Sequence, residues 1–111
     1  MKKELERIMK KYEKIGFEYG KPIGCLEFRN GSNKEEFEKE IISLDNLKKI
    51  VIQKRGGEKR YLLYFIYSRR RGRAYVLTFR EKIRIITIYP LGKKTLKKWK
   101  RNVLKILKLF I

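Results

Sequence analysis

The feature that most constrains the fold is a run of three β-rich segments between residues 60 and 89. They read RYLLYFIYS, AYVLTFR and KIRIITIY, and short turns separate them. Aromatic and β-branched residues of this kind favour strands. In the first segment Tyr61, Leu63 and Phe65 share one face, and the residues that alternate with them are apolar as well. This pattern predicts a central strand that is covered on both sides.

A fourth strand is predicted at residues 49–54, KIVIQK, and a turn at residues 55–58 joins it to the first segment. Arg80 and Glu81 are expected to form a tight turn between the last two strands. Strict alternation at residues 82–89 would place four side chains on one face, namely Ile83, Ile85, Thr87 and Tyr89. Together the four segments predict an antiparallel sheet.

Helices are predicted in the N-terminal part of the chain. Residues 2–14 have the apolar spacing of an amphipathic helix. Ser32 or Asn33 can cap a second helix. The core-facing side chains of that helix would be Phe37, Ile41, Ile42 and Leu44. Between the two helices, glycines and a proline indicate turns, and the segments FEY and CLEFRN would form a small hairpin.

Residues 93–111 predict a basic C-terminal helix. Its apolar stripe comprises Leu96, Trp99, Val103, Ile106, Leu107 and Phe110. The stripe fits either a helix packed on the sheet or a helix on a membrane surface, and the apolar faces of the sheet favour packing. We therefore expect a single α+β domain, residues 1–111. It would have N-terminal helices packed on a four-stranded antiparallel sheet, with a basic C-terminal helix.

Charge is distributed unevenly along the chain. Residues 1–50 contain 12 Lys and Arg against 10 Asp and Glu, residues 51–111 contain 19 against 2, and the formal net charge is +19. Self-repulsion at this density costs stability, so we expect the C-terminal half to face a polyanion, an anionic membrane surface or an acidic protein. No signal peptide or apolar run of about 18 residues is present, which predicts a cytoplasmic protein without integral membrane association.

The residue inventory excludes several kinds of chemistry. The chain has no histidine and only one cysteine, Cys25, which excludes histidine-dependent catalysis, structural zinc and an internal disulfide. Cys25 is expected to pack. The acids Glu35, Glu36, Glu38 and Glu40 predict a solvated helix face rather than a metal site, and no glycine-rich nucleotide loop is present. We expect no metal and no cofactor.

Arginines, lysines and tyrosines remain. Residues 68–73, SRRRGR, form a predicted hairpin loop with four arginines, and a planar guanidinium binds phosphate oxygens in a bidentate manner. The predicted nucleic-acid-binding set is Arg69, Arg70, Arg71, Arg84, Lys97 and Arg101. Tyrosines on the strands can add stacking surfaces for bases. The alternative for this segment is a solvated loop without a ligand.

The stretch from Gly72 to Lys94 resembles the RelE/ParE superfamily of toxins, whose RelE branch includes ribosome-dependent messenger RNA endonucleases. The matching features are Arg73 before AYVLTF, the turn Arg80-Glu81-Lys82, the strand IRIITIY and the step Gly92-Lys93-Lys94. The end of the stretch also resembles the related BrnT toxins, in which such a strand runs into a basic helix. The resemblance implies a RelE-like fold, an RNA substrate such as ribosome-bound messenger RNA, and an acidic antitoxin protein as partner.

By position, Arg73 matches the family arginine that contacts the scissile phosphate, and Lys93 or Lys94 matches the basic residue after the last strand. The resemblance implies a metal-independent endoribonuclease, in which the 2′-hydroxyl of the RNA attacks the adjacent phosphorus. Arg73, Lys93 and Lys94 would stabilise charge on the phosphoryl oxygens. The general base would be a lysine or tyrosine whose pKa neighbouring cations lower, and Tyr89 beside the glycine turn is a candidate.

The chain departs from the RelE pattern at other positions. The two lysines that RelE-type enzymes carry on the preceding strand match Tyr64 and Ile66 here, and their late tyrosine falls near Trp99 or Lys100. The alternative hypothesis is a basic nucleic-acid-binding protein without catalysis. It needs only the excess of cations in the C-terminal half, and it predicts an affinity that falls steeply with salt.

Overall fold

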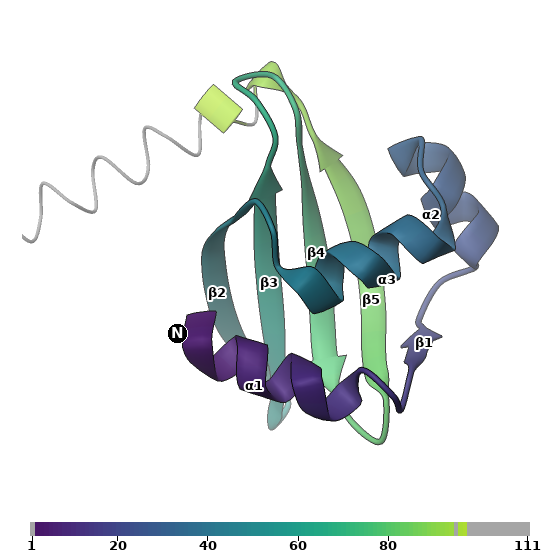
Figure 1. Cartoon of the computed structure of the whole chain (residues 1–111). Helices are drawn as coiled ribbons and strands as arrows, with labels where there is room; N and C mark the ends of the chain where they lie inside the picture. Colours follow the sequence, from purple (N-terminus) through teal and green to yellow (C-terminus); the bar gives the residue numbers. More distant parts are fainter. Residues whose placement is uncertain (1, 95, 98–111) are drawn as a thin grey trace, which may run out of the picture.

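The computed structural model describes residues 2–94, 96 and 97. In chain order the elements are α1 (Lys2–Tyr12), β1 (Phe17–Tyr19), α2 (Ile23–Asn30), α3 (Lys34–Ser43), β2 (Leu47–Arg55), β3 (Glu58–Ile66), β4 (Gly72–Phe79) and β5 (Ile83–Leu91) (Figure 1). The predicted α+β class is confirmed. Lys93, Lys94, Leu96 and Lys97 are helical. The rest of the predicted C-terminal helix, with Arg101 and most of its apolar stripe, lies outside the described residues.

The strands form one mixed sheet in the order β1-β5-β4-β3-β2. β2 to β5 pair antiparallel with their neighbours in sequence, as predicted. The prediction of only four antiparallel strands was wrong, because β1 adds a parallel strand beside β5, with Phe17 opposite Ile83 and Tyr19 opposite Ile85. The added strand gives the first part of β5 hydrogen-bond partners that it would otherwise lack at the sheet edge.

The segment between α1 and α3 does not form the predicted hairpin. FEY is β1, and CLEFRN lies in α2, which follows Pro22 and ends at Gly31 in the left-handed conformation. Proline suits a helix start, and glycine is the usual residue in a left-handed cap. Pro22 and Gly31 are therefore helix boundaries, whereas Gly24 lies within α2. Cys25, which was predicted to pack, is exposed on α2.

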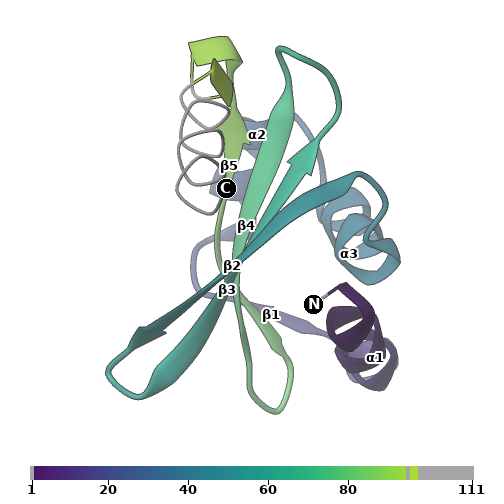
Figure 2. The ribbon, with the colours of Figure 1, turned by 90° about the vertical axis from the view of Figure 1, so that its left-hand side faces the viewer.

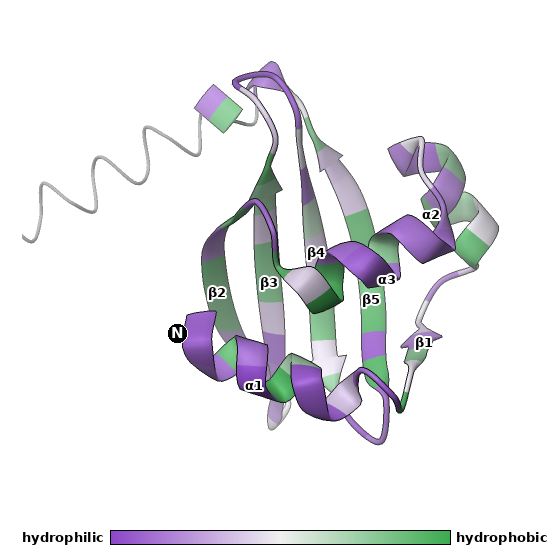
Figure 3. Ribbon diagram, viewed as in Figure 1, coloured by the Kyte–Doolittle hydropathy of each residue, from purple (hydrophilic) through white to green (hydrophobic). Residues whose placement is uncertain are grey.

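α1 and α3 cover one face of the sheet (Figure 2). α3 starts as predicted, because the side chain of Asn33 accepts a hydrogen bond from the backbone N–H of Glu36 at 2.9 Å. The buried core contains Leu5, Met9, Phe37, Ile41, Leu44, Leu63, Phe65, Tyr75, Leu77, Ile83, Ile85 and Ile88. The strands are largely hydrophobic, whereas the loop between β3 and β4 is hydrophilic (Figure 3). Burial of these apolar side chains stabilises the fold.

A bulge changes the alternation along β5. Ile85 and Thr87 lie opposite consecutive residues of β4, so β5 carries one extra residue between them. Ile83 and Ile85 share the face toward the core, but beyond the bulge Ile88 faces the core, and Tyr89 packs on the opposite face. The prediction that Thr87 and Tyr89 share a face with Ile83 and Ile85 was wrong. One extra residue in a strand moves each side chain after it to the opposite face of the sheet.

The face of the sheet opposite α1 and α3 carries a smaller apolar cluster. Its buried residues are Ala74, Leu91 and Leu96, and Tyr64, Ile66 and Tyr89 pack around them. Leu96 therefore anchors the first helical turn after β5 to the sheet. The strands approach closely at this end, since a Cβ on Gly72 would lie 2.8 Å from the carbonyl oxygen of Phe65. None of the helices in the described part of the chain is long and apolar enough to cross a membrane.

Candidate nucleic-acid interface

Two basic segments meet at one end of the sheet. The loop of residues 67–71 joins β3 to β4, and residues 92–94, 96 and 97 follow β5 at the same end (Figure 1). This follows from the antiparallel order, which places the end of β3, the start of β4 and the end of β5 together. Two pockets lie here, and Arg70 lines both of them.

The smaller pocket, of about 320 Å³, is surrounded by cations. We call it the cationic pocket. Arg69 and Arg70 from the loop line it together with Lys93, Leu96 and Lys97. None of its four cations forms an ion pair with a carboxylate within the part of the chain that the structure describes. Four like charges around one volume repel one another, so an anion bound among them is stabilised.

The larger pocket, of about 620 Å³, contains charges of both signs. We call it the mixed pocket. It is lined by Glu36 and Glu40 from α3 and by Tyr67, Arg70, Arg71 and Arg73 from the loop and the start of β4. Residues from the ends of α2 and β5 complete the wall. A ligand with both hydrogen-bond donors and acceptors would find partners for each.

Glu40 is the centre of a hydrogen-bond network at the mixed pocket. Its carboxylate accepts hydrogen bonds from the hydroxyl of Tyr75 at 2.6 Å, from the hydroxyl of Tyr67, and from Nη1 of Arg73 at 3.3 Å. The Glu40 and Arg73 side chains are only 15% and 14% exposed. Burial and the hydrogen bonds to Glu40 raise the pKa of both tyrosines, so both donate as neutral phenols. The network ties α3 to β4 and to the loop.

Arg73 is already paired, in contrast to the free phosphate-binding arginine that the RelE resemblance implies. Its guanidinium carbon lies 5.1 Å from the ring centroid of Phe37 and 5.8 Å from that of Tyr67, in addition to the ion pair with Glu40. Contact with a phosphate would have to compete with this carboxylate. Arg73 lines the mixed pocket, but its arrangement is that of a structural residue.

The structure places only some of the other predicted site residues at the two pockets. Arg71 lines the mixed pocket. Lys94 is exposed on the first helical turn and lines neither pocket. Arg84 lies near the start of β5, at the opposite end of that strand, where it pairs with Glu18 of β1 at 3.5 Å. Arg101 lies outside the described residues.

Tyr89 lacks the property that a general base requires. It lies in the apolar cluster on the face of the sheet opposite α1 and α3, beside Tyr64. Burial and the hydrogen bond with Tyr64 raise the pKa of Tyr89 to about 12. The expected lowering by neighbouring cations is therefore wrong, because apolar surroundings disfavour the phenolate. At neutral pH Tyr89 is protonated.

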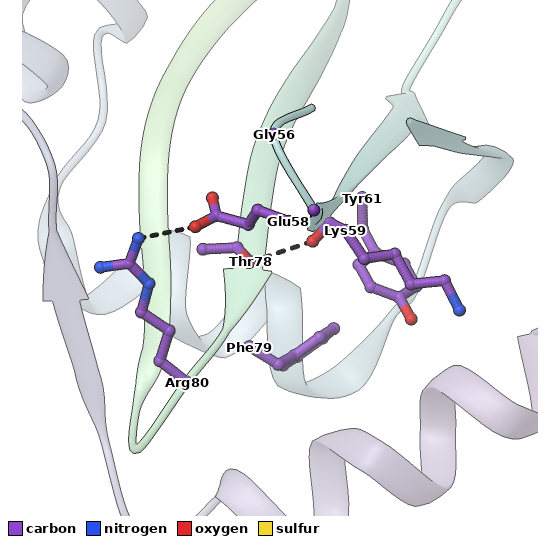
Figure 4. Close-up of a pocket in the computed structure, with 8 residues that line it drawn as sticks. Gly56, Glu58, Lys59, Tyr61, Thr78, Phe79 and Arg80 are labelled. Atoms are coloured by element: carbon purple, nitrogen blue, oxygen red, sulfur yellow. Dashed lines mark hydrogen bonds and ion pairs between the residues drawn. The ribbon is translucent and has the colours of Figure 1, made fainter. Parts of the chain in front are cut away.

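Two arginines at the opposite end of the sheet pair with a carboxylate. A pocket of about 470 Å³ lies there, beside the turn between β2 and β3 (Figure 4). Glu58 accepts a hydrogen bond from Nη2 of Arg80 at 2.7 Å and lies 3.5 Å from Nε of Arg60. The ammonium of Lys59 lies 5.9 Å from the ring centroid of Tyr61. This end is therefore a weaker candidate for binding an anion than the cationic pocket.

Sequence reasoning missed the acidic side of the site, because it assigned the carboxylates of α3 to a solvated face. A local signal did exist for Glu40. It follows Phe37 by three positions and precedes Leu44 by four, which puts it on the apolar stripe of the helix. A carboxylate at such a position needs a partner. The partner, Arg73, is 33 residues away, and no local pattern indicates it.

Comparison of the chain with known protein families, with curated proteins and with solved structures gives no match. The resemblance to RelE/ParE toxins therefore stays a prediction from the short motifs between Gly72 and Lys94. Within the described residues, no group of three or more His, Cys, Asp or Glu side chains is placed to hold a metal ion.

We predict that Glu40→Gln destabilises the fold by roughly 3 kcal/mol, because it leaves the buried guanidinium of Arg73 without a counter-charge. Urea unfolding at pH 7 measures the loss. Glu35→Gln is the matched control, since Glu35 is exposed on the same helix. The control should change the free energy of unfolding by less than about 0.5 kcal/mol. Equal losses in the two variants would show that the network does not hold α3 on the sheet.

We predict that Tyr89 titrates near pH 12 in the folded protein, where burial raises its pKa to about 12. The ultraviolet absorbance of tyrosinate, compared between the wild type and Tyr89→Phe, isolates this group. Because the folded pKa lies above the unfolded value of about 10, the stability that Tyr89 contributes is complete below pH 10 and is lost as the pH rises through 12. A midpoint well below 10 would restore Tyr89 as a candidate general base.

Proposed function

We propose that this protein binds nucleic acid, with RNA as the expected form, through the phosphodiester backbone. The observation that carries the proposal is the cationic pocket, where Arg69, Arg70, Lys93 and Lys97 surround one volume without an acidic partner among the described residues. The arginines supply planar forks and the lysines supply compact charges, a combination that suits phosphate oxygens.

The distribution of acids supports the same surface. Most carboxylates of the described residues lie on α1, α2 and α3, whereas residues 67–71 and the described part of residues 92–97 contain none. The three helices are close to neutral, with 8 Lys and Arg against 7 Glu, so a polyanion is attracted more strongly to the end with the cationic pocket. The same field would accelerate association at low salt.

We predict a steep decrease of affinity with salt, because each phosphate contact releases bound counterions. Fluorescence anisotropy with a short uridine oligoribonucleotide measures the slope of log affinity against log salt. Arg69→Ala/Lys97→Ala should reduce the magnitude of this slope by about 1 to 1.5, as expected for two lost contacts to a single strand. Lys3→Ala/Lys10→Ala removes the same charge from exposed positions on α1 and is the matched control. An affinity that is nearly independent of salt would reject the proposal.

A second candidate function is a RelE- or BrnT-like toxin that cleaves messenger RNA and is neutralised by an acidic antitoxin. The observation in its favour is that the mixed pocket, with the carboxylates of Glu36 and Glu40, adjoins the cationic pocket at Arg70. A phosphate held by Lys93 and Arg70 would bring its ribose close to a carboxylate that can accept a proton. Such a site would need neither Tyr89 as base nor a free Arg73.

Cleavage is best tested by changing the substrate, because Arg73→Ala would leave the buried carboxylate of Glu40 unpaired and disturb the fold. The purified protein is incubated with an RNA and with DNA of the same sequence, in the presence of a chelator. We expect cleavage of the RNA alone, with cyclic phosphate ends, because the 2′-hydroxyl is the nucleophile. RNA that stays intact, both naked and during translation, would reject the ribonuclease and leave binding as the function.

A further inference from the structure

We propose that the mixed pocket binds an unpaired guanine base of the bound strand. This inference rests on the proposed nucleic-acid binding and adds a base-specific site to a surface that holds the backbone. Arg70 lines both pockets, so a strand with a phosphate in the cationic pocket has a base within reach of the mixed pocket. A volume of about 620 Å³ is ample for one base.

Tyr67 gives the mixed pocket a stacking surface. Tyr67 is 42% exposed, although its hydroxyl donates a hydrogen bond to Glu40 and the guanidinium of Arg73 lies over its ring. A ring held in this way loses little conformational freedom when a base stacks on it. Stacking of a base on an aromatic ring contributes affinity for any base, so selectivity has to come from hydrogen bonds.

Glu36 is the carboxylate of the pocket that can select a base. Both oxygens of Glu40 already accept hydrogen bonds within the protein. The Oε2 atom of Glu36 accepts a hydrogen bond from Ser32, whereas its Oε1 has no protein donor among the described residues. A carboxylate is an acceptor only, so it favours a base edge that presents N–H groups.

Guanine is the base that matches this set of partners. Its Watson–Crick edge presents two neighbouring donors, N1–H and N2–H, and its other edge presents the acceptors O6 and N7. The donors match Glu36, and the acceptors match the guanidinium groups of Arg70 and Arg71, which also line the pocket. Adenine, cytosine and uracil do not present two neighbouring donors beside two such acceptors.

The proposed contacts require the guanine to be unpaired. Glu36 would occupy the edge that pairs with cytosine in a duplex, so the base must come from a single strand or a loop. Recognition of single-stranded bases by stacking and by their Watson–Crick edges is the common mode for RNA. The pocket therefore predicts preference for an exposed guanine over the same base in a helix.

The test compares uridine oligoribonucleotides with and without one central guanosine, by fluorescence anisotropy at fixed salt. We expect the guanosine to tighten binding roughly tenfold, and this gain to fall to within about twofold in Glu36→Gln. Glu35→Gln changes the neighbouring residue, which does not line the pocket, and should keep the full gain. Substitution by adenosine, or pairing of the guanosine in a hairpin stem, should remove the gain.

A competition experiment with guanosine monophosphate shows whether the mixed pocket binds a guanine within a strand or a free guanine nucleotide. The free nucleotide should compete weakly, because it lacks the neighbouring phosphates that the cationic pocket holds. Competition as strong as that of the oligonucleotide would overturn the assignment to a strand. Salt-dependent binding without preference for guanosine would overturn the guanine site and leave the proposed nucleic-acid binding intact. Failure of every oligonucleotide and of the nucleotide to bind would reject both.

Discussion

The ion pair between Glu40 and Arg73 determines how the end of the sheet with the two pockets is built. Both side chains are largely buried, so each would be an uncompensated charge without the other. Hydroxyl groups of Tyr67 and Tyr75 occupy the remaining acceptor sites of the carboxylate. Because α3, β4 and the loop each contribute to this network, it sets where the loop arginines lie relative to Glu36.

The same network divides the arginines of the SRRRGR segment into two groups. Arg73 is neutralised and held between rings, whereas residues 69–71 have no carboxylate partner within the described part of the chain. At the other end of the sheet, Glu58 compensates Arg60 and Arg80 in a similar way. The ion pairs with carboxylates within the described part of the chain involve Arg60, Arg73, Arg80 and Arg84, and the cations of the cationic pocket are not among them. The repulsion among the cations of the pocket is tolerated because solvent screens exposed charges.

Local signals in the sequence predicted those parts of the fold that local interactions decide. The Asn33 cap and the buried face of β3 with Leu63 and Phe65 are as expected, because capping and alternation depend on neighbouring residues. The segment FEY was expected to be a strand of a hairpin, but its parallel pairing and its register come from β5, which no local pattern indicates. The bulge in β5 likewise depends on pairing with β4, so alternation alone placed Tyr89 on the wrong face.

The cationic half of the site could be predicted, because antiparallel order brings the loop and the residues that follow β5, such as Lys93 and Lys97, to one end of the sheet. The acidic half could be predicted only in part, because the position of Glu40 on the apolar stripe indicates a need for a partner but not that α3 reaches this end of the sheet. The presence of the acidic half changes the chemistry open to the protein. A purely cationic surface would hold any polyanion, whereas a carboxylate repels phosphate and favours the N–H groups of a base. Glu36 in one pocket with Arg70 therefore argues for a surface that distinguishes bases as well as binding the backbone.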